Sequence, residues 1–572
     1  MISPSHFLGL GKVMYSSGIC WLSENCRLED TEIYLTERLT RKKSAGDWPV
    51  VALEKLRSDY EFSPEEISLA ENRDVLDPLA YEKLKQEQTP FFEYLQKKQL
   101  HLFSRHFNPE IEFIGHHEAH ALSAEFMSPY EKALILVVDG AGSNATDLQQ
   151  LPNHLKATPT NKTHYESMSL YALDKNAEVS LRPLKKLWHD YRNQNQGPWK
   201  VSDGLGMFYE RAAEFIFNSN QAAGKVMGLA SFGKAEGIIS SRSEFIENLP
   251  FDKRFIGKTK KEWEASSSHD YFKNLAATVQ TEFEKTILDF VKKAKEQYPD
   301  YENLILVGGC ALNCTTNGKI LSQKIFHSVY VPPFPGDGGI SLGCAYSQLK
   351  KHQKKSSAVV SFEDQHGFLG PKSSIPTEDE ILATFKDYKI SKPDHLEQEV
   401  AEILKNEKIV AWFQGRSESG PRALGHRSLL ASVDRKDLKS YLNQFVKFRE
   451  SFRPYGCSVI YEKAHEFFEI DSGTHNPYMS FAVKVKAKYK ERLDPVVHID
   501  GSSRMQTVQS KTNPRFHKLL LEMDRLTGLP LLLNTSLNIM GEPICETIAE
   551  LKIFFEQSVV DILVVEDYVI RK

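Results

Sequence analysis

Two apolar runs that end in glycine-rich turns constrain the fold of this chain more than any other feature. Ala133 to Val138 leads into Asp139-Gly140-Ala141-Gly142, and Leu304 to Val307 leads into Gly308-Gly309-Cys310-Ala311-Leu312-Asn313. A short apolar run bounded by glycine predicts a buried strand followed by a tight turn. Turns at strand ends are where α/β folds bind nucleotides. The pattern therefore predicts an α/β fold, with candidate nucleotide contacts at Gly140, Gly142, Gly308, Gly309 and Asn313.

A chain of 572 residues is too long for one ordinary domain, so we expect two or three. After a third glycine turn, Pro332 to Gly339, the residues Ile340 to Tyr346 predict a buried helix. A polar stretch starts at Lys350, and Thr377 and Glu380 then show capping-box spacing. We place the boundary near residue 373, which gives domains 1–373 and 374–572. Because glycine motifs fall on both sides, two ligand sites are expected.

His116 and His120 lie four residues apart, which would place both imidazoles on one face of a helix. The segment lacks the His-Glu-x-x-His order of zinc proteases. Asp139 and Asp337 each stand at or inside a glycine turn and are natural partners. Two histidines and two carboxylates suit iron, manganese or another divalent ion. Plain helix packing is the alternative interpretation.

Gly420 to Leu430, followed by Lys447, Arg449 and Arg453, packs cations around a glycine turn. Glycine lets the backbone approach an anion, and Pro421 suits the first position of a helix. The block predicts a site for a small phosphorylated or carboxylated ligand on a loop and a helix start. A surface ion-pair network is the competing interpretation.

Three further segments could complete an anion site. Glu37 to Lys43 holds four cations, which fit either a solvated helix end or an anion-binding arm. Leu531 to Ser536 is an apolar strand that breaks into amide and hydroxyl groups, among them Asn534 and Ser536. Arg504 lies in a polar segment before it.

Composition excludes several classes of protein. With 72 basic and 76 acidic residues the net charge is −4, which argues against a broad nucleic-acid or membrane-surface footprint. The seven cysteines show no CxxC spacing, so neither a disulfide scaffold nor a structural zinc site is expected. No run approaches the roughly 18 apolar residues of a membrane span. We expect a cytoplasmic protein without a membrane partner.

Taken together, these motifs resemble the ATP-dependent O-carbamoyltransferases of the nodulation-factor and antibiotic-tailoring type, including the aminoglycoside carbamoyltransferase of nebramycin biosynthesis. The resemblance covers nearly the whole chain. It is carried by His116 to His120, Gly415 to Leu430, Lys447 to Pro454 and Asn534 to Pro543. It implies an N-terminal actin-like ATPase domain, similar to universal tRNA threonylcarbamoyl transferases, and a C-terminal YrdC-like α/β domain.

The resemblance also implies the chemistry. Carbamoyl phosphate would be hydrolysed in the C-terminal domain and held by Arg422, Lys447, Arg504, Asn534 and Ser536. ATP in the first domain would convert carbamate to carbamoyl adenylate, with Lys43 offsetting phosphate charge and Gly308 to Asn313 approaching the nucleotide. A divalent metal, iron first, with magnesium and manganese as alternatives, would lie on His116, His120, Asp139 and Asp337. A hydroxyl of a sugar or antibiotic-like molecule would accept the group.

One departure from the family concerns the acceptor step. Family members carry a histidine and an aspartate in an N-terminal turn, whereas Val13 to Cys20 contains neither. Tyr15 or an acidic residue of the acceptor pocket would have to activate the hydroxyl. A tRNA-modifying relative and a regulatory nucleotide-binding protein that has lost transfer activity are the alternatives. The acceptor's identity stays open, and so does a homodimer.

Overall fold

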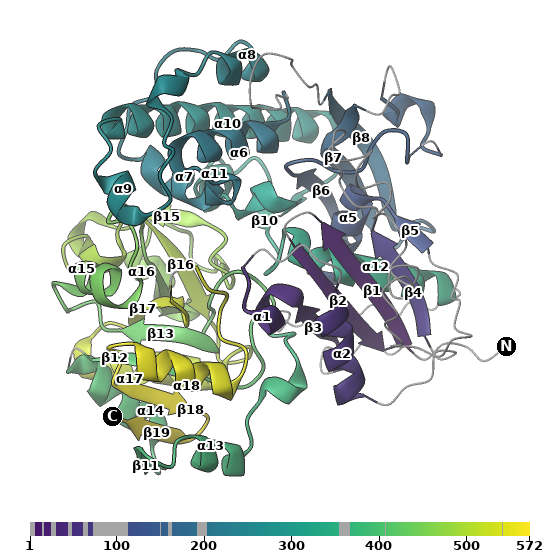
Figure 1. The fold of residues 1–572 in the computed structure, drawn as a ribbon. Helices are drawn as coiled ribbons and strands as arrows, with labels where there is room; N and C mark the ends of the chain where they lie inside the picture. Colours follow the sequence, from purple (N-terminus) through teal and green to yellow (C-terminus); the bar gives the residue numbers. More distant parts are fainter. Residues whose placement is uncertain are drawn as a thin grey trace.

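The computed structural model describes residues 6–13, 16–23, 30–43, 49–60, 67–72, 112–148, 150–157, 163–190, 203–353, 367–406, 408–539 and 541–572. Helices and strands alternate along most of this length, and the strands form three sheets (Figure 1). The predicted α/β class is therefore confirmed. Tyr15, the candidate replacement for the missing histidine, lies outside the described residues.

The first two sheets share one plan. In the first, β1 (His6–Val13), β2 (Ser16–Ser23) and β3 (Glu32–Leu35) form an antiparallel meander, and β4 (Ile67–Asn72) and β5 (Glu112–Ile114) add in parallel beside β1. The second repeats this order with β6 (Lys132–Val138), β7 (His164–Asp174), β8 (Leu181–Asp190), β9 (Asn303–Val307) and β10 (Ser328–Tyr330). The same five-stranded plan is therefore used twice in this part of the chain.

Two helices pack between these sheets. α5 (His116–Met127) contributes Ala121 and Ala124 to the core beneath β6, and α12 (Ile340–His352) packs on β1 and on α5. Glycine permits the close approach, because a Cβ on Gly343 would lie 1.9 Å from the carbonyl oxygen of Ala119. The predicted buried helix after the third glycine turn is α12.

The remaining helices of this part flank the sheets. α10, 29 residues long, lies with α6 to α9 and α11 above the C-terminal part in Figure 1. The bounds of these flanking helices are α1 (Thr36–Thr40), α2 (Val50–Asp59), α6 (Leu205–Phe217), α7 (Ala223–Ala230), α8 (Arg242–Glu247), α9 (Lys260–Glu264), α10 (His269–Gln297) and α11 (Cys314–Ser322).

The third sheet has nine strands in mixed orientation. Their order is β11 (Lys389–Ser391), β19 (Tyr568–Arg571), β18 (Ile562–Val565), β12 (Ile409–Phe413), β13 (Arg427–Ala431), β17 (Leu531–Ser536), β14 (Gly456–Ile460), β16 (Ser502–Val508) and β15 (Ala482–Lys484). Val410 and Trp412 face one core while Ala411 and Phe413 face another, as the two-residue period of a strand requires. The C-terminal part of the chain is thus of the α/β class.

Helices cover both faces of the nine-stranded sheet. α14 (Leu396–Lys405) and α17 (Pro514–Thr527) cover one face, and α13 (Glu378–Thr384) and α18 (Ile548–Gln557) contribute to the core on the other. The short helices α15 (Leu438–Tyr441) and α16 (Ala464–Phe467) lie at its periphery. Thr377 and Glu380 form the predicted capping box of α13. We propose that the domain boundary lies just before it, near residue 373.

The prediction that a helix starts at Pro421 is wrong. Gly420 to Gly425 form a loop, and the following residues are strand β13. β13 pairs on both sides, with β12 and β17, and all five of its residues are buried. A central strand satisfies its backbone groups in the ladder, so tertiary pairing overrides the local helix signal.

The two parts share a packed interface. A Cβ on Gly318 of α11 would lie 2.0 Å from the carbonyl oxygen of Ala482 in β15. Phe452 also packs against Trp263 of α9, with ring centroids 5.3 Å apart. In the described parts of the chain, no helix combines the length and apolar character that spanning a bilayer demands.

Gly343→Ala should destabilise the protein by about 1–3 kcal/mol, because the added methyl group forces α5 and α12 apart. Gly224→Ala in α7 is the matched control, since a Cβ there meets nothing within 4 Å. Thermal unfolding followed by circular dichroism should show a lower Tm for Gly343→Ala alone. Equal Tm values for the two variants would contradict the close-packing account.

Candidate active site at the domain interface

Four side chains from three elements converge at the edge of the second sheet. His116 and His120 project from α5, Asp139 follows β6, and Asp337 lies in the turn before α12. The Nε2 atoms of His116 and His120 lie 3.1 and 3.0 Å from Asp139 Oδ2. One ligand atom of each residue falls within 4.8 Å of all the others. The structure thus brings together the whole predicted metal-ligand set.

Backbone packing explains this convergence. β6 and β9 are parallel neighbours, so their carboxyl ends and following turns meet at one edge. Gly308 has φ +91°, and a Cβ there would lie 2.2 Å from the carbonyl oxygen of Val138. Its N–H donates to the carbonyl of Pro335 at 2.7 Å, which joins the third glycine turn to the same edge.

The donor set fits a divalent metal ion. Burial alone would lower the pKa of His120, but its hydrogen bond to Asp139 and the nearby carboxylate of Asp337, 3.6 Å away, raise it to about 9. Burial would raise the pKa of Asp139, yet the two histidines hold it well below its usual range. Asp337 Oδ1 is buried without a hydrogen-bond partner in the described structure. Two imidazole nitrogens and two carboxylates are ligands suited to iron or manganese.

The glycine turns approach the site closely, but several of their amides are already used. Gly140 N–H donates to Asp139 Oδ1 at 2.7 Å, and Gly142 N–H donates to the carbonyl of Glu166 at 2.8 Å. Asn313 N–H donates to the carbonyl of Cys310, and its side chain caps α11. Gly309 lies against the metal-ligand set, since a Cβ there would be 2.9 Å from Asp139 Oδ1. The turns therefore let a ligand approach the backbone closely, but the N–H groups named here already have acceptors within the protein.

A cluster of cations lies beside these turns. Arg422 Nη2 is 3.5 Å from the carbonyl oxygen of Leu312, so the C-terminal loop reaches the turn after β9. Burial and the charge of Arg504 lower the pKa of Arg422 to about 9. Burial lowers the pKa of Lys447 well below its usual range, and Arg449 and Arg453 lower it further. The sites expected on separate domains are thus adjacent.

Lys43, from the first domain, belongs to the same neighbourhood. Burial lowers its pKa, and the charges of Arg453 and Arg422 lower it further. Arg453 therefore acts on Lys43, Arg422 and Lys447 alike. Arg449 and Arg453, which the sequence groups with Lys447 at the predicted anion site, lie in the same cluster. Crowded cations of this kind are relieved by a bound anion.

Neutral oxygens and one unpaired acceptor complete the cluster. Lys447 Nζ donates to Ser536 and to Asn538, whose Oδ1 is 2.7 Å away. Asn534 Nδ2 donates to the carbonyl of Ala423 at 3.2 Å and to Ser458 Oγ at 2.9 Å. Asn534 Oδ1 is buried without a partner among the described residues. An amide or amine hydrogen of a ligand would satisfy it.

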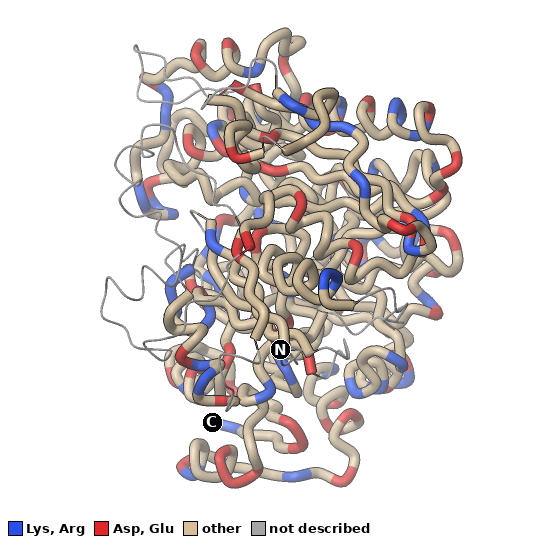
Figure 2. The backbone as a smooth tube through the Cα atoms, turned by 90° about the vertical axis from the view of Figure 1, so that its right-hand side faces the viewer, with Lys and Arg blue, Asp and Glu red and all other residues tan. Residues whose placement is uncertain are grey.

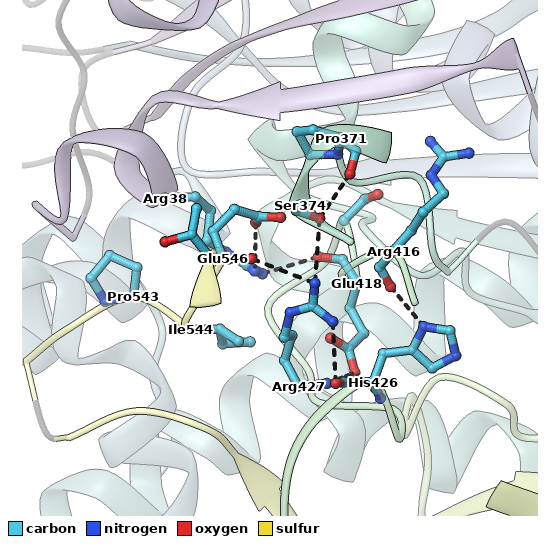
Figure 3. Close-up of polar contacts among 12 residues, drawn as sticks. Arg38, Pro371, Ser374, Arg416, Glu418, His426, Arg427, Pro543, Ile544 and Glu546 are labelled. Atoms are coloured by element: carbon cyan, nitrogen blue, oxygen red, sulfur yellow. Dashed lines mark hydrogen bonds and ion pairs between the residues drawn. The ribbon is translucent and has the colours of Figure 1, made fainter. Parts of the chain in front are cut away.

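A buried carboxylate shapes the loop that carries Arg422 (Figure 3). Glu418 Oε1 accepts the N–H groups of Leu424, His426 and Arg427 at 2.7, 2.9 and 3.1 Å. Arg38 of α1 donates to the carbonyls of Glu418 and Gly420 at 3.1 and 3.0 Å, which ties the first domain to this loop.

Arg427 has a different role from Arg422. Its side chain is fully buried, donates to the carbonyls of Gln414 and Gly415, and lies over the ring of Phe413. The structure therefore uses one arginine of the motif to hold the loop and the other to face the cation cluster.

His120→Ala should abolish binding of one divalent metal ion, because the cluster loses an imidazole ligand. His154→Ala is the control, since His154 is exposed and lies outside the cluster. Purified variants reconstituted with Fe²⁺ or Mn²⁺ under anaerobic conditions and desalted should be compared by elemental analysis. Equal metal content in both variants would remove the proposed metal site.

Two family models match most of the chain. The description "Carbamoyltransferase N-terminus" matches residues 52–346, and "Carbamoyltransferase C-terminus" matches residues 401–572. Among solved structures, full-length HypF in its phosphate- and nucleotide-bound form is 14% identical and covers 61% of this chain and 47% of that chain, with a TM-score of 0.37. The activator of 2-hydroxyisocaproyl-CoA dehydratase from Clostridium difficile is 16% identical and covers 61% and 96%, with a TM-score of 0.33.

Curated relatives give the same answer. Nodulation protein NolNO of Sinorhizobium fredii is 32% identical over 81% of this chain, which spans 64% of that protein's length. Nodulation protein NolO of Bradyrhizobium diazoefficiens is 30% identical over 80% of this chain and 79% of its own length. An uncharacterised Synechocystis protein, sll1178, is 30% identical over 81% and 77%. With both family models matched in order around the site, the chain belongs to the carbamoyltransferase family and is a transferase enzyme.

Proposed function

We propose that this enzyme uses carbamoyl phosphate and ATP to carbamoylate a hydroxyl group of a small molecule. The observation that carries the proposal is the contact between the two candidate sites, where Arg422 of the cation cluster reaches the turn after β9. A dianionic donor and a nucleotide could then be handled within one interface. Carbamate released at one site would have a short enclosed route to the other.

The cation cluster is the proposed donor site. Arg422, Lys447 and Arg504 supply charge for the phosphate group, and guanidinium forks match phosphate geometry. Ser536 lies within reach of Lys447, at 3.3 Å between Oγ and Nζ. Asn534 offers its unpaired Oδ1 to the carbamoyl amide. Water attack on the carbamoyl carbon breaks the bond to the phosphate oxygen and leaves carbamate and inorganic phosphate.

The second half of the reaction belongs to the edge of the second sheet. The oxygen of carbamate attacks the α-phosphorus of ATP, and pyrophosphate leaves with the bonding electron pair. The acceptor oxygen then attacks the carbonyl carbon of carbamoyl adenylate, loses its proton, and AMP leaves. Lys43 and the close turn at Gly309 support nucleotide phosphates there. His116, His120, Asp139 and Asp337 would hold a divalent metal, which supplies positive charge for phosphate oxygens when bound.

The acceptor is proposed to be a small molecule such as a sugar or an antibiotic-like metabolite. Figure 2 shows basic and acidic residues interspersed along the chain on the face it presents, without a broad basic stripe. A tRNA acceptor would favour such a stripe, because phosphate contacts dominate nucleic-acid affinity. Failure to bind tRNA at low salt would agree with the small-molecule acceptor.

Carbamoyl adenylate should form when the protein is mixed with ATP, a divalent metal and carbamoyl phosphate in the absence of an acceptor. Mass spectrometry would detect the adenylate, and a coupled assay would follow pyrophosphate. Omitting carbamoyl phosphate is the control and should give neither product. ATP binding without a donor-dependent adenylate would contradict the proposed reaction.

His120→Ala should lose adenylate formation and keep phosphate release from carbamoyl phosphate, because His120 belongs to the metal-ligand set and the donor cations are intact. Both activities are measured on the same preparation, together with its Tm. Loss of phosphate release at an unchanged Tm would show that the two half-reactions cannot be separated in this way.

Arg422→Ala should lower phosphate release from carbamoyl phosphate by about 10²-fold or more, since removing a preorganised charge costs roughly that much. ATP binding, measured by calorimetry, should change little. Arg525→Ala is the matched control, because that arginine is exposed on α17 and paired only locally with Glu522. Full donor hydrolysis by Arg422→Ala would exclude the cluster as the donor site.

A further inference from the structure

A cavity of about 400 Å³ lies in the C-terminal part of the chain. It is bounded by the end of β12, by the linker at Phe368 and Leu369, and by the start of α17. Its volume is in the range that small-molecule sites occupy. None of the residues assigned above to the metal ligands or the donor site lines it.

One wall of the cavity is a flat ring pair. The rings of Phe368 and His426 stack with centroids 3.7 Å apart and an interplanar angle of 15°. His426 Nδ1 is 2.6 Å from the carbonyl of Arg416, which fixes the ring (Figure 3). Burial lowers the pKa of His426 to about 4, so the ring is neutral at physiological pH. Stacked rings with adjacent apolar side chains suit a planar ligand.

The opposite wall holds groups that favour an anion. It is the N-terminus of α17, a helix of 14 residues, whose dipole favours negative charge. Asn513 caps this helix, because its Oδ1 accepts the N–H of Phe516 at 3.2 Å. This contact fixes the amide, and Asn513 Nδ2 is buried without a hydrogen-bond partner in the described structure. Asn513 lines the cavity and is 6% exposed.

The charged residues of the lining are held by partners of their own. Arg416, Arg515 and Glu566 line the cavity, and the guanidinium group of Arg416 donates to the carbonyls of Gly370 and Thr31. Arg515 pairs with Asp567, 2.5 Å away, and lies 3.8 and 3.9 Å from carboxylate oxygens of Glu566 and Glu397. It also donates to Gln414 at 2.6 Å. Burial raises the pKa of Glu566, whose Oε1 accepts the N–H of Gly415 at 2.6 Å. The preference for an anion therefore depends on the start of α17 and on Asn513 Nδ2, while the other end of the cavity is apolar and ring-lined.

We infer that this cavity binds a small organic anion in which a carboxylate or phosphate group is attached to a planar ring. The anionic group accepts a hydrogen bond from Asn513 Nδ2 at the start of α17, and the ring lies along Phe368 and His426. Because His426 belongs to the segment that folds around Glu418, the occupant would contact the loop that carries Arg422.

The test uses the full chain with benzoate, phenyl phosphate and the neutral benzamide as probes, followed by saturation-transfer NMR and affinity titration. Asn513→Ser and Asn513→Asp both keep a side-chain oxygen that caps α17, yet neither has the amide donor. We expect each substitution to weaken benzoate or phenyl phosphate binding by about tenfold or more. Benzamide should bind at least about tenfold more weakly than benzoate.

Arg422→Ala distinguishes binding in this cavity from binding in the cation cluster. Because Arg422 does not line the cavity, the substitution should leave binding of the favoured anion unchanged. Preference for benzoate or for phenyl phosphate decides between a carboxylate and a phosphate ligand. Binding that Arg422→Ala abolishes, or that both Asn513 variants retain at an unchanged Tm, would overturn the inference. Absence of binding by both anions would overturn it as well.

Discussion

The carboxylate of Glu418 is the interaction on which the arrangement of the interface depends. It is almost fully buried and accepts three backbone N–H groups from Leu424 to Arg427, so it fixes the turn of the loop without help from a regular helix. A buried carboxylate that gathers several amide donors is strongly held, since each such bond to a charged group is worth about 1.5–3 kcal/mol. The loop in turn presents Arg422 to the first domain.

The interface is closed by groups from both parts of the chain. Arg38 donates to the carbonyls of Glu418 and Gly420. Arg41 donates to the carbonyls of Pro543 and Ile544. Close backbone contacts add to these bonds, because a Cβ on Gly420 would lie 2.2 Å from the carbonyl oxygen of Pro333. The cation cluster is therefore formed by residues of both parts of the chain, since Lys43 lies beside Arg422 and Arg453.

Local sequence signals predicted the individual elements well. The strands before the glycine turns are β6 and β9, the two histidines lie on one face of α5, and Thr377 caps α13. Each of these depends on residues close in sequence, through apolar periodicity, helical spacing or capping. The loop at Gly420 was misassigned because glycine, proline and arginine resemble a helix start. Only pairing with β12 and β17 makes the next segment a strand.

The sequence by itself determined the α/β class, the four metal-ligand candidates and the cations that could bind an anion, because residue type and short-range spacing specify them. Tertiary structure decided which cations share one site. It separated Arg422 from the buried Arg427 and brought Lys43 of the N-terminal part beside Arg422 and Arg453. It also placed Arg422 against the turn at Leu312, 110 residues away in sequence. Such contacts arise from the packing of whole domains, which no local pattern encodes.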